Sequence, residues 1–493
     1  MKIIEDEDRD LIPRWRRFDK SLDETRSISP PSSSGGNVQD ISPDLLTEWE
    51  ESPNLTLASE IVSSAYLTNS KQTALSAARM VAESANVTGI ANKLAMNILG
   101  KPVEDERHSL FEEDEWVRQV RVRTNRYPRD PIAWVDLALA YVISGKMKSA
   151  DRALKVAVSL APDDRFVLRS VARFYVHQNE SEVALHILRK SLATKHDPWL
   201  ISTEIALCEA LDRTSPLTKL GRTMVLKPHL PPHHVAELSG EIATVEYRHG
   251  SIRNATKLFK KSLIDPTENA VAQASWASRR EKAFELSGIG PSPLSPEAVA
   301  WEAYREGDWK RAGDFSTQWF NDQPFSVRPV LLGSCAQGIA LENYSEAIKM
   351  CEKSVKCNPD EILLLNNCAF NLAMNNQVEK AEQYFDRIPG EIEDKEKATA
   401  TILIATRGLL RIKGGHIDAG ISDYKRAITI AAENRDFDRA VMAFSNLALE
   451  LLAINRLEDA KQMIKAATEV EKLVNDKLSL LVLSRAKERI FQS

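Results

Sequence analysis

The feature that most constrains this chain is a residue pattern that recurs at a spacing of 34 residues between positions 131 and 198. The first copy contains Trp134, Leu137, Ala138, Tyr141, Gly145, Ala150, Leu154, Ala157 and Pro162. The second copy contains Leu168, Val171, Ala172, Tyr175, Ala184 and Leu188. The early members of each copy fall on one stripe of a helix, and the later members fall on one stripe of a second helix. The period therefore predicts a stack of antiparallel helix pairs.

This pattern resembles the tetratricopeptide repeat, whose signature runs W-x2-L-G-x2-Y, then A-x3-F, then P. Ala138 stands at the signature glycine and Leu154 at the aromatic position, and the family tolerates both substitutions. The resemblance covers about residues 131–468, and pattern alone extends it to about 43–129. It implies an all-α fold, a right-handed α-solenoid of antiparallel helix pairs. In that family the first helix of each pair lines a concave surface that holds peptides.

Composition and pattern divide the chain into six expected segments. They are 1–41, a disordered leader; 42–129, a helical region with degenerate repeats; 130–285, a first TPR-like array; 286–297, a Gly/Pro-rich break; 298–475, a second TPR-like array; and 476–493, a capping helix. The leader is rich in Ser, Pro and Gly, which cannot form a core. The break contains the stretch Gly-Ile-Gly-Pro-Ser-Pro, which interrupts helices.

The leader carries one segment with the composition of a docking motif. Trp15 is flanked by three arginines directly after an acidic run, and Trp and Arg are enriched where binding energy concentrates. Docking on another chain and docking on the body of this chain both stay open.

Charge and cysteine content limit the class of protein. The net charge is −5 and the sequence pI is about 6.1, which argues against nucleic acid as a partner. The five cysteines have no C-x-x-C spacing, which favours a reducing, cytoplasmic location. No run of 18 apolar residues occurs, so we expect no membrane partner.

No motif with a chemical mechanism is present. The chain lacks a phosphate-binding loop, an H-E-x-x-H pair, a G-x-S-x-G elbow and the protein-kinase motifs. We therefore expect no enzyme activity, no cofactor and no metal site. His229, His233 and His234 could bind zinc, but no nearby Cys completes a set, so we interpret them as an inter-repeat loop.

The candidate binding residues lie on first helices, at positions that packing does not use. Arg169, Arg173 and His177 share one stripe at spacings of four residues. Two arginines one turn apart repel each other, and an acidic ligand would relieve that repulsion. The alternative is a solvated basic face balanced by acidic neighbours.

Further candidates come from a repeated Tyr-Arg-x-Gly sequence, in which Gly favours a left-handed turn after the helix. It contains Tyr247 and Arg248 in one copy and Tyr304 and Arg305 in the other, with Trp301 one turn before Tyr304. Farther along the chain, Asn366 and Phe370 hold the corresponding stripe. The resemblance implies that an Asn at this place grips the ligand backbone through its amide.

The sequence therefore predicts a non-enzymatic scaffold or adaptor that binds a protein or peptide, acidic and aromatic in character, in its concave groove. One alternative is an RNA-binding helical-repeat protein, which the acidic total disfavours. Another is a regulatory subunit of a partner enzyme. Self-association also stays open.

Overall fold

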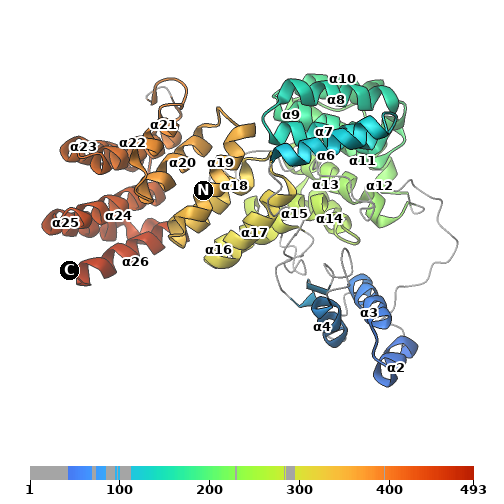
Figure 1. The fold of residues 1–493 in the computed structure, drawn as a ribbon, viewed down its shortest axis with the longest axis horizontal. Coiled ribbons are helices and arrows are strands. Elements are labelled where there is room, and N and C mark those ends of the chain that lie inside the picture. The colour runs from blue at the N-terminus through green and yellow to red at the C-terminus, as the bar shows by residue number, and fades with distance from the viewer. Residues whose placement is uncertain are drawn as a thin grey trace.

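A computed structural model describes residues 43–68, 74–84, 95–96, 98–99, 113–227, 230–281, 284, 295–392 and 395–492. Throughout these ranges every regular element is a helix, and the helices form a solenoid of antiparallel pairs (Figure 1). The predicted fold class is confirmed. The leader 1–41 with Trp15 lies outside the described residues, as do positions 286–294 of the expected break.

The N-terminal helices are α2 (Pro43–Glu51), α3 (Leu55–Thr68) and α4 (Leu75–Glu83). Small residues fill the core between α3 and α4, since Ala58, Ala74, Ala77 and Ala78 are all fully buried. These helices form a hydrophobic cluster of their own.

The first array runs from α6 to α15. Its helices are α6 (Glu113–Arg126), α7 (Pro131–Ile143), α8 (Met147–Leu160), α9 (Arg165–His177), α10 (Ser181–Lys190), η3 (Ala193–Lys195), α11 (Pro198–Ala210), α12 (Thr218–Val225), α13 (Pro232–His249), α14 (Ile252–Ser262) and α15 (Glu268–Arg280). Even-numbered helices up to α14 are the outer members of the pairs.

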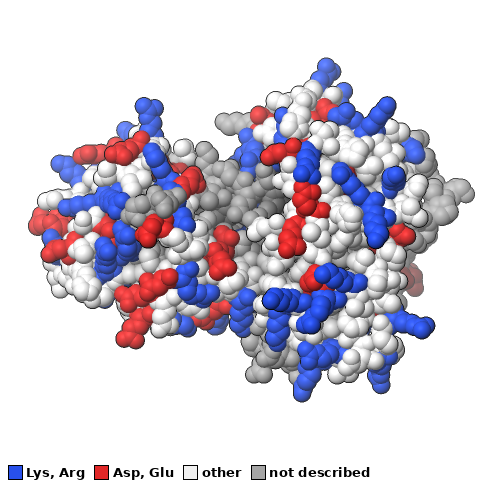
Figure 2. All heavy atoms as spheres, turned by 90° about the horizontal axis from the view of Figure 1, so that it is seen from above, with Lys and Arg blue, Asp and Glu red and all other residues white. Residues whose placement is uncertain are grey.

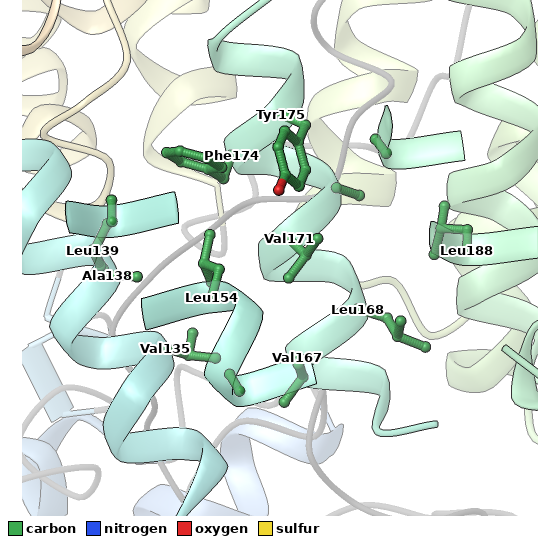
Figure 3. Close-up of a cluster of buried hydrophobic side chains, with 14 of the residues drawn as sticks. Val135, Ala138, Leu139, Leu154, Val167, Leu168, Val171, Phe174, Tyr175 and Leu188 are labelled. Atoms are coloured by element: carbon green, nitrogen blue, oxygen red, sulfur yellow. The ribbon is translucent and has the colours of Figure 1, made fainter. Parts of the chain in front are cut away.

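Local sequence sets where the inner helices of this array begin. Asp130 and Asp197 precede Pro131 and Pro198, and each aspartate accepts a hydrogen bond from a backbone N–H in the first turn of its helix. The inner and outer helices then approach closely through Ala138 and Ala150, both fully buried, as the repeat pattern predicts. Figure 3 shows Leu154 of α8 among the side chains of α7 and α9.

The second array runs from α16 to α26. Its helices are α16 (Pro296–Glu306), α17 (Trp309–Asp322), α18 (Arg328–Ser334), the π-helical segment η5 (Cys335–Ala340), α19 (Tyr344–Cys357), α20 (Ile362–Met374), α21 (Val378–Phe385), α22 (Lys397–Lys413), α23 (Ile417–Glu433), α24 (Phe437–Ala453), α25 (Leu457–Val470), η7 (Glu471–Leu473) and α26 (Lys477–Gln492). Gly307 adopts the predicted left-handed turn, with φ of 78°. Gly250 does not, since its φ is −133°.

The two arrays pack against each other through the loop between α17 and α18. Phe325 in this loop is fully buried and belongs to the hydrophobic core of α7–α11. The Arg173 guanidinium lies 5.3 Å from the Phe325 ring centroid, and the His177 ring lies 5.6 Å from it. The start of the second array therefore closes back on early repeats of the first.

The last helix, α26, turns back across the second array. The Tyr304 hydroxyl at the start of that array donates to Asp476 Oδ1 at 3.2 Å, and Lys477 Nζ donates to the Glu306 carbonyl at 2.8 Å. Leu478 packs in the core of α16–α20, while Val482 packs with α24. The capping helix thus joins the first and last repeats of its array.

Candidate functional site

The second array encloses a groove of about 540 Å³. Its walls come from the inner helices α18, α20, α22 and α24, from η5, and from the start of α26. Three of the residues singled out in the sequence, Tyr304, Asn366 and Phe370, meet in this groove. A cavity of this size lies within the range of small-ligand and peptide sites.

Two asparagines of α20 in the groove wall each have a carboxamide oxygen without a partner. Asn366 and Asn371 are each 2% exposed, and the carboxamide oxygen of each has no hydrogen-bond partner. A buried polar atom without a partner costs about 1–3 kcal/mol. Formation of the α20 helix alone therefore does not explain why these two asparagines are buried. Such atoms are satisfied when a ligand supplies N–H groups. Asn446 of α24 lines the same groove.

The acidic residues that line the groove, Asp436, Asp438 and Asp476, all have donors within this chain. Asp438 Oδ1 accepts the backbone N–H groups of Asn475 and Asp476, at 2.8 and 3.1 Å. Asp436 forms an ion pair with Arg439. The remaining surface consists of amide, hydroxyl and apolar side chains, among them Phe370, together with Arg435. The groove therefore suits an uncharged polar backbone with apolar side groups.

The π-helical segment η5 shapes one wall of the groove. A Cβ atom on Gly338 would lie 1.8 Å from Asn371 Oδ1, so only glycine allows the two helices to approach this closely. The widened turn leaves the carbonyls of residues 339 and 340 without ordinary helical partners. The Arg485 guanidinium of α26 donates to both, at 2.8 and 2.7 Å.

Cys335 on the same wall is not a nucleophile at neutral pH. Burial raises the pKa of its thiol to about 11, so the thiolate that reacts with electrophiles is scarce. Cys335 instead contributes an apolar surface to the groove.

The stripe Arg169, Arg173 and His177 does come together on α9, but it faces other parts of this chain. Arg169 is 4% exposed, pairs with Glu237 at 2.7 Å and stacks on the Trp199 ring. Glu237 also accepts hydrogen bonds from the side chains of Thr267 and Asn269, so α9, α13 and α15 are linked across the concave side. Arg173 and His177 contact Phe325, as described above. The inner stripe of the first array is thus covered by α13 and α15 of the same array and by Phe325 of the second array.

The other predicted residues are spread over several places. The Tyr247 ring packs against the Phe284 ring, with 5.2 Å between the ring centroids. The Arg248 guanidinium nitrogen Nη1 lies 3.7 Å from Glu209 Oε2. Trp301 is fully buried beneath the Arg279 guanidinium, and Arg305 is exposed. None of these four lines the groove.

The sequence analysis did not identify most of the residues that line the groove. Missed residues on the walls are Asn367, Asn371, Thr401, Thr406, Asn446, Leu478 and Ser479. One signal was available, since three asparagines interrupt the apolar helix Ile362–Met374. Polar residues inside an otherwise apolar helix need a partner. The contribution of α26 had no local signal, because it depends on where the solenoid brings its last helix.

Comparisons with known proteins do not place the chain in a family. No protein-family model matches the chain, and no curated protein matches it. Among solved structures, yeast Tom70 is 12% identical, with 88% of this chain and 96% of that chain covered, at a TM-score of 0.28. At this level the likeness says nothing about what the chain binds. In the described part of the chain, no helix has the length and apolar character needed to cross a membrane.

Proposed function

We propose that this protein is a non-enzymatic interaction scaffold that binds a peptide segment of a partner protein in the groove of its second array. The observation that carries the proposal is the unpaired Asn366 amide, buried in the wall of a groove of about 540 Å³. A peptide backbone presents N–H and C=O groups at regular intervals and can satisfy this amide and that of Asn446.

The chemistry of the walls indicates the kind of peptide. Phe370, Ile402 and Met442 offer apolar contacts beside the amides. Apolar or aromatic side chains of a ligand would bury against them. The expected acidic character rested on Arg169 and Arg173, and both have partners within this chain. The proposal therefore keeps the peptide ligand and the aromatic contacts, without a requirement for acidic residues.

A displayed library of random peptides, selected on the full chain, tests this function. We expect selected peptides to share apolar residues. We expect Asn366→Ala to weaken their binding at least about fivefold, the effect of one lost hydrogen bond worth about 1 kcal/mol. The Asn366 carboxamide oxygen has no hydrogen-bond partner in the chain, so the substitution removes no hydrogen bond at that atom, and circular dichroism checks that the variant stays folded.

Asn254→Ala is the matched control, because Asn254 is exposed on the outer helix α14. It should leave peptide affinity unchanged. Two outcomes would refute the proposal. In one, the library yields no binders. In the other, the selected peptides bind the Asn366→Ala variant as tightly as the unmodified chain.

A further inference from the structure

A row of exposed apolar side chains follows one edge of the first array. The outer helices α6, α8, α10, α12 and α14 each carry a large apolar residue at the C-terminal end or within two residues beyond it. These rim residues and their exposed fractions are Tyr127 (56%), Leu160 (39%), Leu192 (78%), Leu226 (76%) and Ile264 (67%). Single exposed apolar residues are common on proteins, but recurrence at one repeat position on five successive helices is not.

Contacts between successive loops place neighbouring rim residues beside one another. The Asp163 carboxylate, just after Leu160, accepts the Leu192 backbone N–H at 2.9 Å. The Lys261 ammonium, just before Ile264, donates to the Val225 carbonyl. Two of the four neighbouring pairs, Leu160 with Leu192 and Leu226 with Ile264, are therefore held close to each other through their loops.

The second array does not continue this row. After α17 the corresponding apolar residue is Phe325, which is fully buried against the first array. After α19 it is Cys357, which is 3% exposed. After α25, Leu473 at the end of η7 is 53% exposed. The unbroken succession of exposed apolar residues from one outer helix to the next is therefore confined to the first array.

Basic side chains accompany the row. Those exposed in or next to the same loops are Arg126, Arg129, Lys190, Lys195, Lys227 and Lys260. The exposed acidic residues there are fewer: Asp163 and Asp164 accept backbone N–H groups of Leu192 and Val167, and Asp265 lies beside Ile264. Figure 2 shows that Lys and Arg dominate much of the first-array side of the face seen from above, whereas both signs of charge mix over the second array.

The shape of the row indicates its partner. The rim residues are separate protrusions, and a protein partner would need a matching series of pockets spaced one repeat apart. The interfacial region of a lipid bilayer accepts apolar protrusions without preformed pockets, and anionic headgroups attract the lysines and arginines that flank them. We propose that this rim is a docking surface for an anionic membrane. This contact is peripheral, so it is compatible with the absence of a crossing helix in the described residues.

Sedimentation of the full chain with lipid vesicles tests the proposal. We expect binding to vesicles of phosphatidylcholine and phosphatidylserine, weaker binding to phosphatidylcholine alone, and a loss of binding as salt rises. The triple variant L192E/L226E/I264E should weaken binding at least about tenfold, because each substitution replaces an inserting group with a repelled one.

The matched control is V183E/I252E. These residues are also exposed, at 38% and 45%, but they lie at the starts of α10 and α14, the opposite ends of two of the same helices. The control should bind vesicles as the unmodified chain does, and circular dichroism should show the same helix content in both variants.

If the triple variant loses helix content, K190E/K227E provides the second test and should also weaken binding to the anionic vesicles. Three results overturn the proposal: no binding to phosphatidylserine vesicles, equal loss in the rim and control variants, or a rim variant that keeps vesicle binding while losing a protein partner.

Discussion

Glu241 allows the sharpest test of the buried interior of the first array. It lies on α13, is 1% exposed, and accepts a hydrogen bond from Gln273 Nε2 at 3.0 Å through one carboxylate oxygen. The other oxygen has no partner. Burial raises the pKa of Glu241 to about 8, and the charges of Glu209 and Glu237 add to the shift, while Gln273 and Arg248 oppose it.

The sign of the pH dependence follows from proton binding. The unfolded chain loses this proton near the ordinary pKa of 4.5, whereas the folded chain keeps it until about pH 8. Between these values the folded state binds more protons, so the free energy of unfolding falls as pH rises, by about 1.4 kcal/mol per pH unit. From about pH 5.5 to about pH 7.5 this single group lowers the stability by about 3 kcal/mol.

The substitution Glu241→Gln removes the titration while keeping the size and a neutral polar group. Urea unfolding across this pH range measures the difference in stability between the variant and the unmodified chain. That difference should shift in favour of the variant by about 3 kcal/mol toward the alkaline end. Glu433→Gln, at an exposed position on α23, is the control and should show no such trend. A parallel pH profile for Glu241→Gln and the unmodified chain would refute the assignment of a neutral buried carboxyl.

Two further substitutions test one contact between the arrays and one contact within the second array. Gly145→Ala places a Cβ 2.5 Å from the Lys356 carbonyl oxygen at a residue with φ of 71°. It should therefore lower the melting temperature more than Gly415→Ala, where φ is also positive but no atom lies within 4 Å of the added Cβ. Equal effects of the two substitutions would contradict the close packing at Gly145. Arg485→Ala leaves the carbonyls of residues 339 and 340 without their donor and should destabilise the packing of α26 by about 1–3 kcal/mol. Limited proteolysis should then cut faster near the C-terminus. Unchanged cleavage would show that Arg485 does not anchor α26.

The fold could be predicted from the sequence because its determinants are local. The spacing from Trp134 to Pro162 contains one helix pair, and each pair packs mainly on its neighbours, so the same pattern predicts every later pair. Ala138 and Ala150 mark the close helix contact before any coordinates are known. The path of the whole solenoid depends on small rotations between neighbouring repeats that add up over many repeats. A local residue pattern does not determine the total rotation. For this reason the contact between Phe325 and α9 was not predictable.

The same physical difference explains which site residues were found. Asn366 and Phe370 could be placed on a groove because their position within one repeat determines the face on which they lie. Arg169 and Arg173 lie on the equivalent face of their own repeat, but Arg169 pairs with Glu237 of the same array and Arg173 lies against Phe325 of the second array. Whether an inner face is open or filled is a property of the array as a whole.

The burial of Phe325 among early helices has a consequence for how this protein can change in evolution. An open solenoid can gain or lose a helix pair in the middle and still stack, because each pair needs only its neighbours. The contact between Phe325 and α9 instead fixes the number of pairs that lie between them. Deleting or duplicating one of these pairs would carry Phe325 past its pocket. Repeat number is therefore constrained between α9 and α17, and repeat gain or loss is compatible with the fold only where the chain does not return to itself.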